Sequence, residues 1–161
     1  MIEYEATVVS ACGKNDRVSD LNCFWMAADA RSPDDLFATR RDGRFESYNP
    51  LRAYYVGLGG NSNTTTRFRR YIGDKELRPL LPEHDLRDRT DLITANRSQT
   101  IRLVAFGKLI QFWRDDRKLF ELADQAPYTS GHFAFRTVTN HLEIRGFRVY
   151  RIEEPVREGD R

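Results

Sequence analysis

Hydrophobic and polar residues alternate with a period of two along most of the chain, which is the pattern of half-buried β-strands. The alternating runs are rich in Val, Ile, Thr, Tyr and Phe, and clusters of Gly, Asn, Asp or Pro separate them. The predicted strands are residues 2–9, 21–28, 51–58, 64–71, 100–106, 109–113, 118–122, 132–138 and 142–152. Because so many short strands fall in one small chain, we expect an all-β sandwich or barrel.

Turns and irregular stretches divide these strands. Gly107-Lys108 and Thr139-Asn140 each predict a hairpin. Residues 32–38 are the best short helical candidate, since Ser-Pro-Asp at their start has the composition of a capped first turn. Residues 29–49 and 73–96 are long and irregular, and in a sandwich we expect them to form the walls of a groove.

Aromatic residues on the alternating strands indicate the core. If two antiparallel sheets pack face to face, one side of each strand is buried between them. We expect the core to include Phe68, Phe112, Phe147 and one of Phe133 and Phe135.

Composition narrows the class of protein. The chain has 161 residues, with 40% hydrophobic residues, which excludes disorder and predicts one sandwich domain over residues 1–152 and a charged tail over 153–161. No apolar stretch is long enough to span a membrane, and a net charge of +2 gives no general attraction to nucleic acid. The basic residues are 22 Arg and 4 Lys. A GC-rich genome explains that bias, as does recognition of carboxylates by the planar guanidinium group.

The cysteines and histidines predict no metal site. Cys12 and Cys23 lack the spacing of a metal site, and two buried free thiols are favoured over a disulfide in an exported protein. The histidines have no zinc-ligand spacing either. No cofactor is expected on these grounds.

The densest polar cluster is residues 15–22, directly before an aromatic strand that contains Trp25. Turn formation by Asn, Asp and Ser is the plain explanation of this cluster. Asp16 and Asp20 are also candidates for a structural Ca²⁺ site with backbone carbonyls, although no spaced loop of the EF-hand kind is present.

A second cluster covers residues 52–71. Its Gly-Gly-Asn bend leads into a strand whose odd positions include Arg67 and Arg69. A strand face that repeats Arg cannot point into an apolar core, so it faces bulk water or lines a polar groove for an anionic ligand. Nucleotide binding is disfavoured, because no Gly-Lys-Ser/Thr motif and no helix follow the bend.

Residues 15–26 and 54–71 resemble an uncharacterised bacterial family found beside polysaccharide-degrading enzymes. The closing pattern, in residues 112–116, 131–137 and 147–150, resembles the end of concanavalin A-like jelly rolls, including YesU-type proteins. The resemblance implies a jelly-roll β-sandwich that binds carbohydrate, and a periplasmic or secreted location. Family members carry strands before the position of Ile2, so it also implies a sandwich that lacks an edge or completes it as a homodimer.

The resemblance implies a polysaccharide or oligosaccharide bound in the concave sheet, and the arginine residues favour one that contains uronic acid. Carboxylate groups would bind Arg67, Arg69 and Arg52, and sugar rings would contact Tyr54 and Trp25. Asn61, Asn63 and Asp20 would hold sugar hydroxyls. The expected substrate-binding residues are Asp16, Arg17, Asp20, Asn22, Trp25, Arg52, Asn61, Asn63, Arg67, Arg69 and Arg136.

Three interpretations of the activity remain open at this point. A polysaccharide lyase would neutralise the uronate carboxylate with Arg or Asn and remove the neighbouring proton with Tyr54 or His141. A lectin-like binding module would need no group with a tuned pKa. A glycoside hydrolase would pair Asp16 or Asp20 with Glu83 or Asp85.

Overall fold

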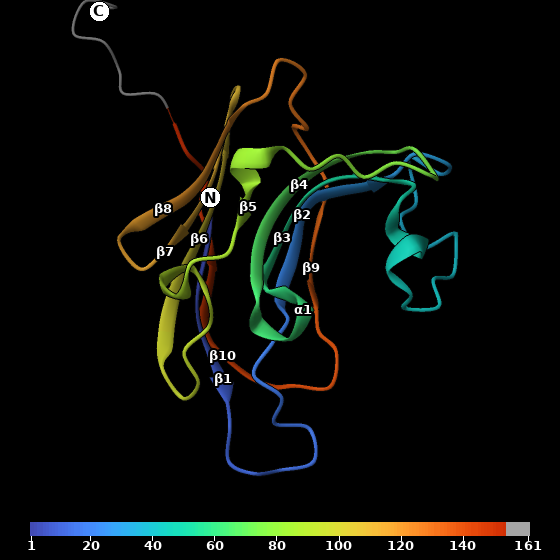
Figure 1. The fold of residues 1–161 in the computed structure, drawn as a ribbon. Helices are drawn as coiled ribbons and strands as arrows, with labels where there is room; N and C mark the ends of the chain where they lie inside the picture. The colour runs from blue at the N-terminus through green and yellow to red at the C-terminus, as the bar shows by residue number, and fades with distance from the viewer. Residues whose placement is uncertain (154–161) are drawn as a thin grey trace, which may run out of the picture.

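The alternating segments fold as two antiparallel five-stranded sheets packed face to face, in a computed structural model that describes residues 1–153 (Figure 1). The back sheet has the order β10 (His141–Val149), β1 (Ile2–Val9), β6 (Ser98–Phe106), β7 (Leu109–Arg114) and β8 (Arg117–Ala123). The front sheet has the order β5 (Asp85–Leu86), β4 (Thr65–Ile72), β3 (Leu51–Gly59), β2 (Leu21–Asp29) and β9 (His132–Arg136). The predicted all-β sandwich is confirmed.

All nine predicted strands are present, with ends that differ by a few residues. The hairpin predicted at Gly107-Lys108 joins β6 to β7, but the one predicted at Thr139-Asn140 is wrong, because β9 and β10 lie in different sheets. The strand that sequence reasoning missed is β5, whose two residues lie inside the stretch expected to be irregular. Four short helical segments complete the described chain: η1 (Phe45–Tyr48), α1 (Gly60–Asn63), η2 (Pro82–His84) and η3 (Arg89–Asp91). None of the helices in the described residues is long and apolar enough to cross a membrane.

The helix predicted over residues 32–38 is wrong. These residues form consecutive turns, in which Ser32 pairs with Asp29 in an isolated bridge. The backbone N–H groups of Ser32 and Asp35 each donate to the carbonyl three residues earlier, and no continuous helical ladder follows. The Asp29 carboxylate binds Arg31 and Arg41, which flank this segment, so ion pairs at its two ends fix the path of the turns.

The larger of two buried apolar clusters lies between the sheets and contains most of the expected aromatic residues, and the smaller, which includes Phe24, Tyr55 and Tyr71, lies on the outer face of the front sheet. Phe68 and Phe112 are each 1% exposed, and Phe133 packs against the same cluster. Phe147 is 44% exposed, so its placement in the core is a wrong prediction. It lies on β10, which is an edge strand, so only one side of it is covered.

The two cysteines are free and differ in environment. Cys23 is buried and burial raises the pKa of its thiol to about 12. Cys12 is exposed, which corrects the expectation that both thiols are buried. Of the predicted tail over residues 153–161, all but Glu153 lies outside the described residues.

Candidate functional site

The outer face of the front sheet carries a polar row that crosses four neighbouring strands. Arg67 on β4 is opposite Gly57 on β3, Gly57 is opposite Asn22 on β2, and Asn22 is opposite Arg136 on β9. One row further along, Arg69 is opposite Tyr55. Because side chains alternate between the faces of a strand, these residues share the face that points away from the core.

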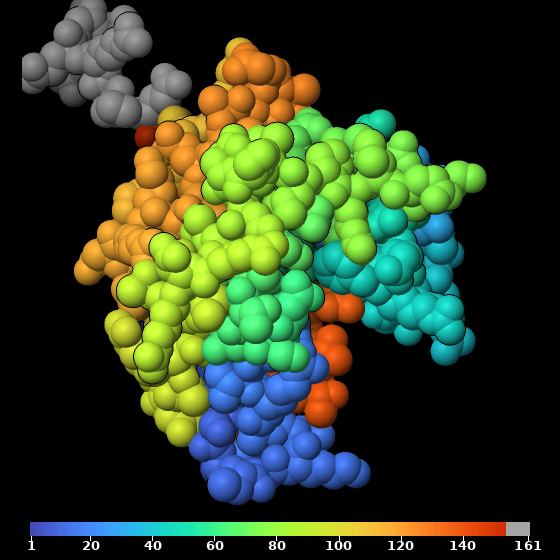
Figure 2. Space-filling view, in the orientation of Figure 1, coloured from blue at the N-terminus to red at the C-terminus, as the bar shows by residue number. Residues whose placement is uncertain are grey.

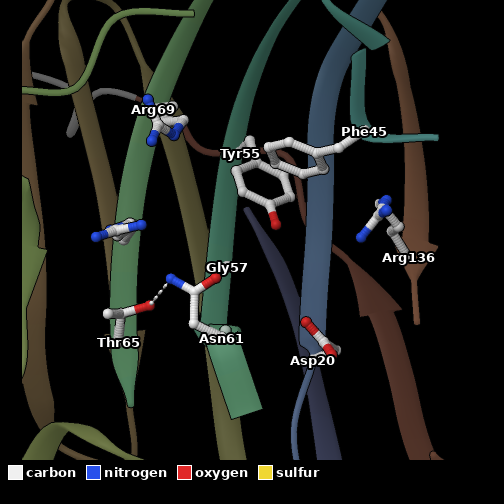
Figure 3. A pocket seen from close by; sticks show the side chains of 10 residues that line it. Asp20, Phe45, Tyr55, Gly57, Asn61, Thr65, Arg69 and Arg136 are labelled. Atoms are coloured by element: carbon white, nitrogen blue, oxygen red, sulfur yellow. Dashed lines mark hydrogen bonds between the residues drawn. The ribbon is translucent and has the colours of Figure 1, made fainter. Parts of the chain in front are cut away.

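A cavity of about 280 Å³ lies over this row. We call it the front cavity. Gly57 forms part of its floor, where a Cβ atom would lie 2.8 Å from the Tyr55 hydroxyl. The floor is therefore open only because this position has no side chain. The lining residues are Asp20, Phe45, Tyr55, Gly57, Gly60, Asn61, Thr65, Arg67, Arg69 and Arg136 (Figure 3).

One wall of the front cavity comes from the segment between β2 and β3, which projects from the sandwich and carries Phe45 (Figure 1). In the space-filling view a hollow lies beneath this segment, beside β9 (Figure 2). Asp29 anchors the segment, because its buried carboxylate accepts bonds from Arg31 (2.9 and 2.7 Å) and from Arg41 (2.5 Å). The hydrogen bonds from Arg31 lower the pKa of Asp29, so the anchor is ionised.

The opposite end of the front cavity is bounded by a left-handed turn. Asn61, Ser62 and Asn63 have φ values of 51°, 59° and 61°. The Asn63 amide fixes this turn to the following segment, since it donates to the Ile93 carbonyl and accepts from the Ile93 N–H, both at 2.9 Å. Asn61 lines the front cavity and its amide lies 3.4 Å from the Thr65 hydroxyl (Figure 3).

The three arginines of the front cavity differ in their partners. Arg67 makes two bonds to Asp85, at 2.8 and 3.1 Å. Arg69 donates to the Arg78 carbonyl at 2.6 Å, and Arg136 donates to the Gly43 carbonyl at 3.3 Å. Within the described chain no carboxylate forms an ion pair with Arg69 or Arg136.

Aromatic rings separate these two arginines. Figure 3 shows Arg69 and Arg136 on opposite sides of the Tyr55 and Phe45 rings. The Arg136 guanidinium lies over the Phe45 ring at 4.8 Å from its centroid. Burial lowers the pKa of Arg69, which reflects the cost of holding its charge in a partly desolvated position. The front cavity therefore combines two positive groups that lack carboxylate partners with an aromatic floor and wall.

The hydroxyl and carboxylate groups of the front cavity are Tyr55 and Asp20. Burial raises the pKa of Tyr55, so its hydroxyl is protonated at neutral pH and no protein group in the described chain hydrogen-bonds to it. The Asp20 carboxylate accepts bonds from Arg17 at 2.9 Å and from the Ser19 hydroxyl at 2.6 Å. Arg17 and Ser19 thus hold Asp20 in place at the rim.

Five of the predicted site residues line the front cavity. They are Asp20, Asn61, Arg67, Arg69 and Arg136. Asn22 lies in the same polar row but is 1% exposed, beneath the lining, and its amide donates to Asp20 at 3.2 Å. The structure thus brings together residues from β2, β4, β9 and the turn after β3.

The structure contradicts the sugar-contacting role predicted for Tyr54 and Trp25. Both are buried between the sheets, at 0% and 2% exposure, so neither presents a ring to a sugar. The Tyr54 hydroxyl donates to Asp124 at 2.7 Å and accepts from the Tyr128 N–H at 3.1 Å. Burial, together with its bond to Asp124, raises the pKa of Tyr54, and its position in the core does not suit a catalytic base.

His141 also lies apart from the front cavity. It begins β10 of the back sheet, with its Nδ1 atom 3.5 Å from the Asp16 carboxylate. Asp16 itself accepts from the backbone N–H groups of Ala11 and Gly13, which is a turn-forming role. Neither residue lines the front cavity, so the lyase base and the hydrolase carboxylate assigned to them have no support in this placement.

The other predicted residues support the front cavity or lie away from it. Arg17 binds Asp20, Asn63 binds Ile93, and Asp85 binds Arg67, so these three act behind the lining. Arg52 is exposed on β3 and does not line the front cavity, and Glu83 is exposed in η2. As for Ca²⁺, the described residues hold no group of three or more His, Cys, Asp or Glu side chains that could surround an ion.

Sequence reasoning missed Tyr55, Phe45 and Thr65. The signal for Tyr55 was present, because it shares strand parity with Gly57 and is opposite Arg69. Phe45 carried no such signal, since it lies in an irregular segment whose path depends on the buried Asp29 anchor.

The chain belongs to a family described as a domain of unknown function, DUF6250, whose model matches residues 1–147. No curated protein matches the sequence. Among solved structures, it is similar to a Bacillus subtilis protein of unknown function with a galectin-like fold, with a TM-score of 0.62 and 18% identity over 91% of this chain and 69% of that chain. It is also similar to the carbohydrate-binding module CBM66 from Bacillus subtilis, with a TM-score of 0.51 and 12% identity over 91% of this chain and 71% of that chain. At these identities the likeness shows the fold, a galectin-like β-sandwich.

Proposed function

We propose that this member of a family without an assigned activity binds a saccharide in the front cavity, and that the saccharide carries acidic groups. The observation that carries the proposal is the pair Arg69 and Arg136. Both line the cavity, and neither has a carboxylate partner in the described chain. A desolvated guanidinium group without a counter-charge favours an anionic ligand, and its planar fork suits a carboxylate.

The remaining lining residues suit a sugar. The half-buried Phe45 ring offers an apolar face for the C–H groups of a pyranose, whereas the Tyr55 ring is 4% exposed and packs against Phe24, so Tyr55 contributes its hydroxyl. Asn61, Thr65 and Asp20 offer further donors and acceptors for hydroxyls. A fold likeness to a carbohydrate-binding module supports the same interpretation. A uronate-containing polysaccharide or oligosaccharide is the ligand class that uses all of these groups.

Arg67 has a different place in this proposal from the one expected from sequence. Its guanidinium already makes two bonds to Asp85, so its charge is balanced without a ligand. We assign it to the shape of the cavity floor and not to carboxylate recognition.

A β-elimination activity is a second candidate, for one observation. The Tyr55 hydroxyl lines the front cavity without a protein partner and is the tyrosine there that could exchange a proton with a bound uronate. Its raised pKa opposes action as a base, so binding without catalysis is favoured. The hydrolase hypothesis has less support, since Asp20 is the one carboxylate in the lining and such enzymes use two.

Calorimetry tests the binding proposal. Oligogalacturonate and a neutral galactose oligomer of equal length would be titrated into wild type, Arg69→Ala and Arg136→Ala. Each substitution is expected to weaken oligogalacturonate binding by about 10- to 150-fold, the worth of a hydrogen bond to a charged group, and to leave neutral binding nearly unchanged. Arg97→Ala is the matched control, because Arg97 pairs with Asp115 outside the cavity.

Three results would contradict parts of the proposal. Absence of oligogalacturonate binding by wild type removes the acidic ligand. Equal losses of affinity for both sugars mean that the arginines shape the cavity and do not recognise the carboxylate. Appearance of an unsaturated uronate product, absent with Tyr55→Phe, replaces simple binding with β-elimination.

A further inference from the structure

Both sheets end on the same side of the sandwich. β9 is the last strand of the front sheet and β10 is the last strand of the back sheet. The two strands are packed together across the core, since Phe135 on β9 and Phe147 on β10 have ring centroids 6.4 Å apart. Within residues 1–153, no strand pairs with the outer edge of either β9 or β10. Two adjacent open edges leave two rows of backbone groups free to pair.

Aromatic side chains are exposed along this side. Phe133, Phe135 and Phe147 surround Tyr4, with ring centroids 5.0 to 6.0 Å from the Tyr4 ring. Phe135 is 36% exposed and Phe147 is 44% exposed, and Val149 at the end of β10 is 71% exposed. An apolar cluster at an open sheet edge favours association with another polypeptide strand.

The sequence of β10 is complementary to itself around Ile144, just before the irregularity at Gly146, where φ is 59° and the pairing with β1 shifts register. In an antiparallel pair of two β10 strands centred on Ile144, residue 143 of one copy is opposite residue 145 of the other. This register places Glu143 opposite the partner's Arg145, and Arg145 opposite the partner's Glu143. Within one chain the two side chains form an ion pair of 3.2 Å, and because those of Arg145 and Glu143 are 75% and 45% exposed, each has room for a second partner.

We propose that β10 pairs with β10 of a second copy of this chain, so that the two back sheets join into one continuous sheet. Ile144 of each copy meets the other at the two-fold axis, and opposite charges flank it on both sides. An isologous contact of this kind closes on itself and gives a dimer rather than a fibre.

The same two-fold axis, perpendicular to the sheets, brings the β9 edges of the two front sheets toward each other. The exposed Phe135 side chains are then covered by apolar groups of the other copy. Because the axis keeps each layer on its own side, both front cavities open on the same side of the dimer. A role for the two cavities in binding one saccharide rests on the proposed function, whereas the pairing itself does not.

Sedimentation equilibrium without sugar tests the pairing, over micromolar to submillimolar protein. Wild type is expected to form a dimer. Glu143→Arg alone and Arg145→Glu alone are each expected to raise the dimer dissociation constant by about tenfold or more, since each places like charges opposite each other at two positions. The double variant, which restores opposite charges in exchanged positions, is expected to recover the wild-type constant within about threefold.

Glu121→Lys is the matched control. Glu121 lies on β8, the other edge of the same sheet, where its partner is Lys118. This change is expected to leave dimerisation unaffected. A wild type that stays monomeric at all concentrations overturns the proposal. A dimer that survives both single reversals, or that the double variant does not restore, overturns it as well. Circular dichroism of every variant separates lost pairing from lost folding.

Discussion

Asn61 has a backbone conformation that most L-residues avoid, with φ 51° and ψ 53°, and its side chain lines the front cavity. The left-handed region costs roughly 1–2 kcal/mol for an ordinary residue and little for Gly, while Asn tolerates it better than most. A residue held there at a cavity rim therefore separates two roles. The backbone conformation affects the stability of the fold, and the side-chain amide affects ligand binding.

This separation gives a prediction for two variants. Asn61→Gly keeps the conformation, so its free energy of unfolding is expected within about 0.5 kcal/mol of wild type, while Asn61→Ala is expected to lose about 1 kcal/mol. Both lose the amide, so both are expected to weaken saccharide binding to the same extent. Urea denaturation and calorimetry measure the two quantities. Wild-type affinity in Asn61→Gly would mean that the amide does not contact the sugar.

Adjacent tyrosines show how a single residue decides between core and cavity. Tyr54 is 0% exposed between the sheets, whereas Tyr55 is 4% exposed on the other face of the front sheet, where it packs against Phe24 and lines the front cavity. Period-two alternation requires that neighbours face opposite sides, so one of the two points between the sheets and the other points to the outer face of the front sheet. Arg67 and Arg69 identify the outer face of β4, and pairing of β4 with β3 selects Tyr55. The sequence alone does not give the register between β3 and β4, so it could not show which tyrosine shares a face with the arginines.

At the scale of elements, strands were predictable and connections were not. The alternating segments gave nine strands within a few residues of their observed ends. By contrast, β5 has two residues and is held on β4 by pairing and by the ion pair of Asp85 with Arg67. The segment before β3 takes its path from Asp29, which binds arginines two and twelve residues away. Such side-chain bonds leave no periodic signal in the sequence.

The attachment of β5 gives a pH prediction. The hydrogen bonds from Arg67, together with one from Arg87, lower the pKa of Asp85 to about 2, below its unfolded value near 3.9. A depressed folded pKa contributes stability that is complete above the unfolded pKa and is lost as the pH falls through the folded pKa. We therefore expect wild type to be more stable than Arg67→Ala at pH 7, and the difference to shrink between about pH 4 and pH 2.

Thermal unfolding across this pH range measures that difference. Asp85→Asn is the control, because it has no carboxyl group to protonate and its difference from its own Arg67→Ala double variant should not change over the same interval. A gap between wild type and Arg67→Ala that stays constant down to pH 2 would contradict the assigned role of the Arg67 ion pair.

At the scale of the whole molecule, the two proposals meet in the β9 edge. Arg136 lies on β9, the edge strand of the front sheet, so the front cavity reaches the open side of that sheet. In the proposed dimer two such cavities open on one face. A polyuronate long enough to enter both would then bind through two sites on one particle, and its second contact would be intramolecular.

A comparison of ligand lengths measures this effect. Wild type and the Glu143→Arg variant are expected to bind a short oligogalacturonate equally, since Glu143 lies on the back sheet away from the front cavity. A long polygalacturonate is expected to bind wild type more tightly than the short one, by about 100-fold or more, while the monomeric variant gains only the statistical factor of repeated sites. The double variant Glu143→Arg/Arg145→Glu should regain the wild-type preference. If wild type and Glu143→Arg show the same ratio of long to short affinity, the two cavities do not share one chain, and the dimer then has no role in binding.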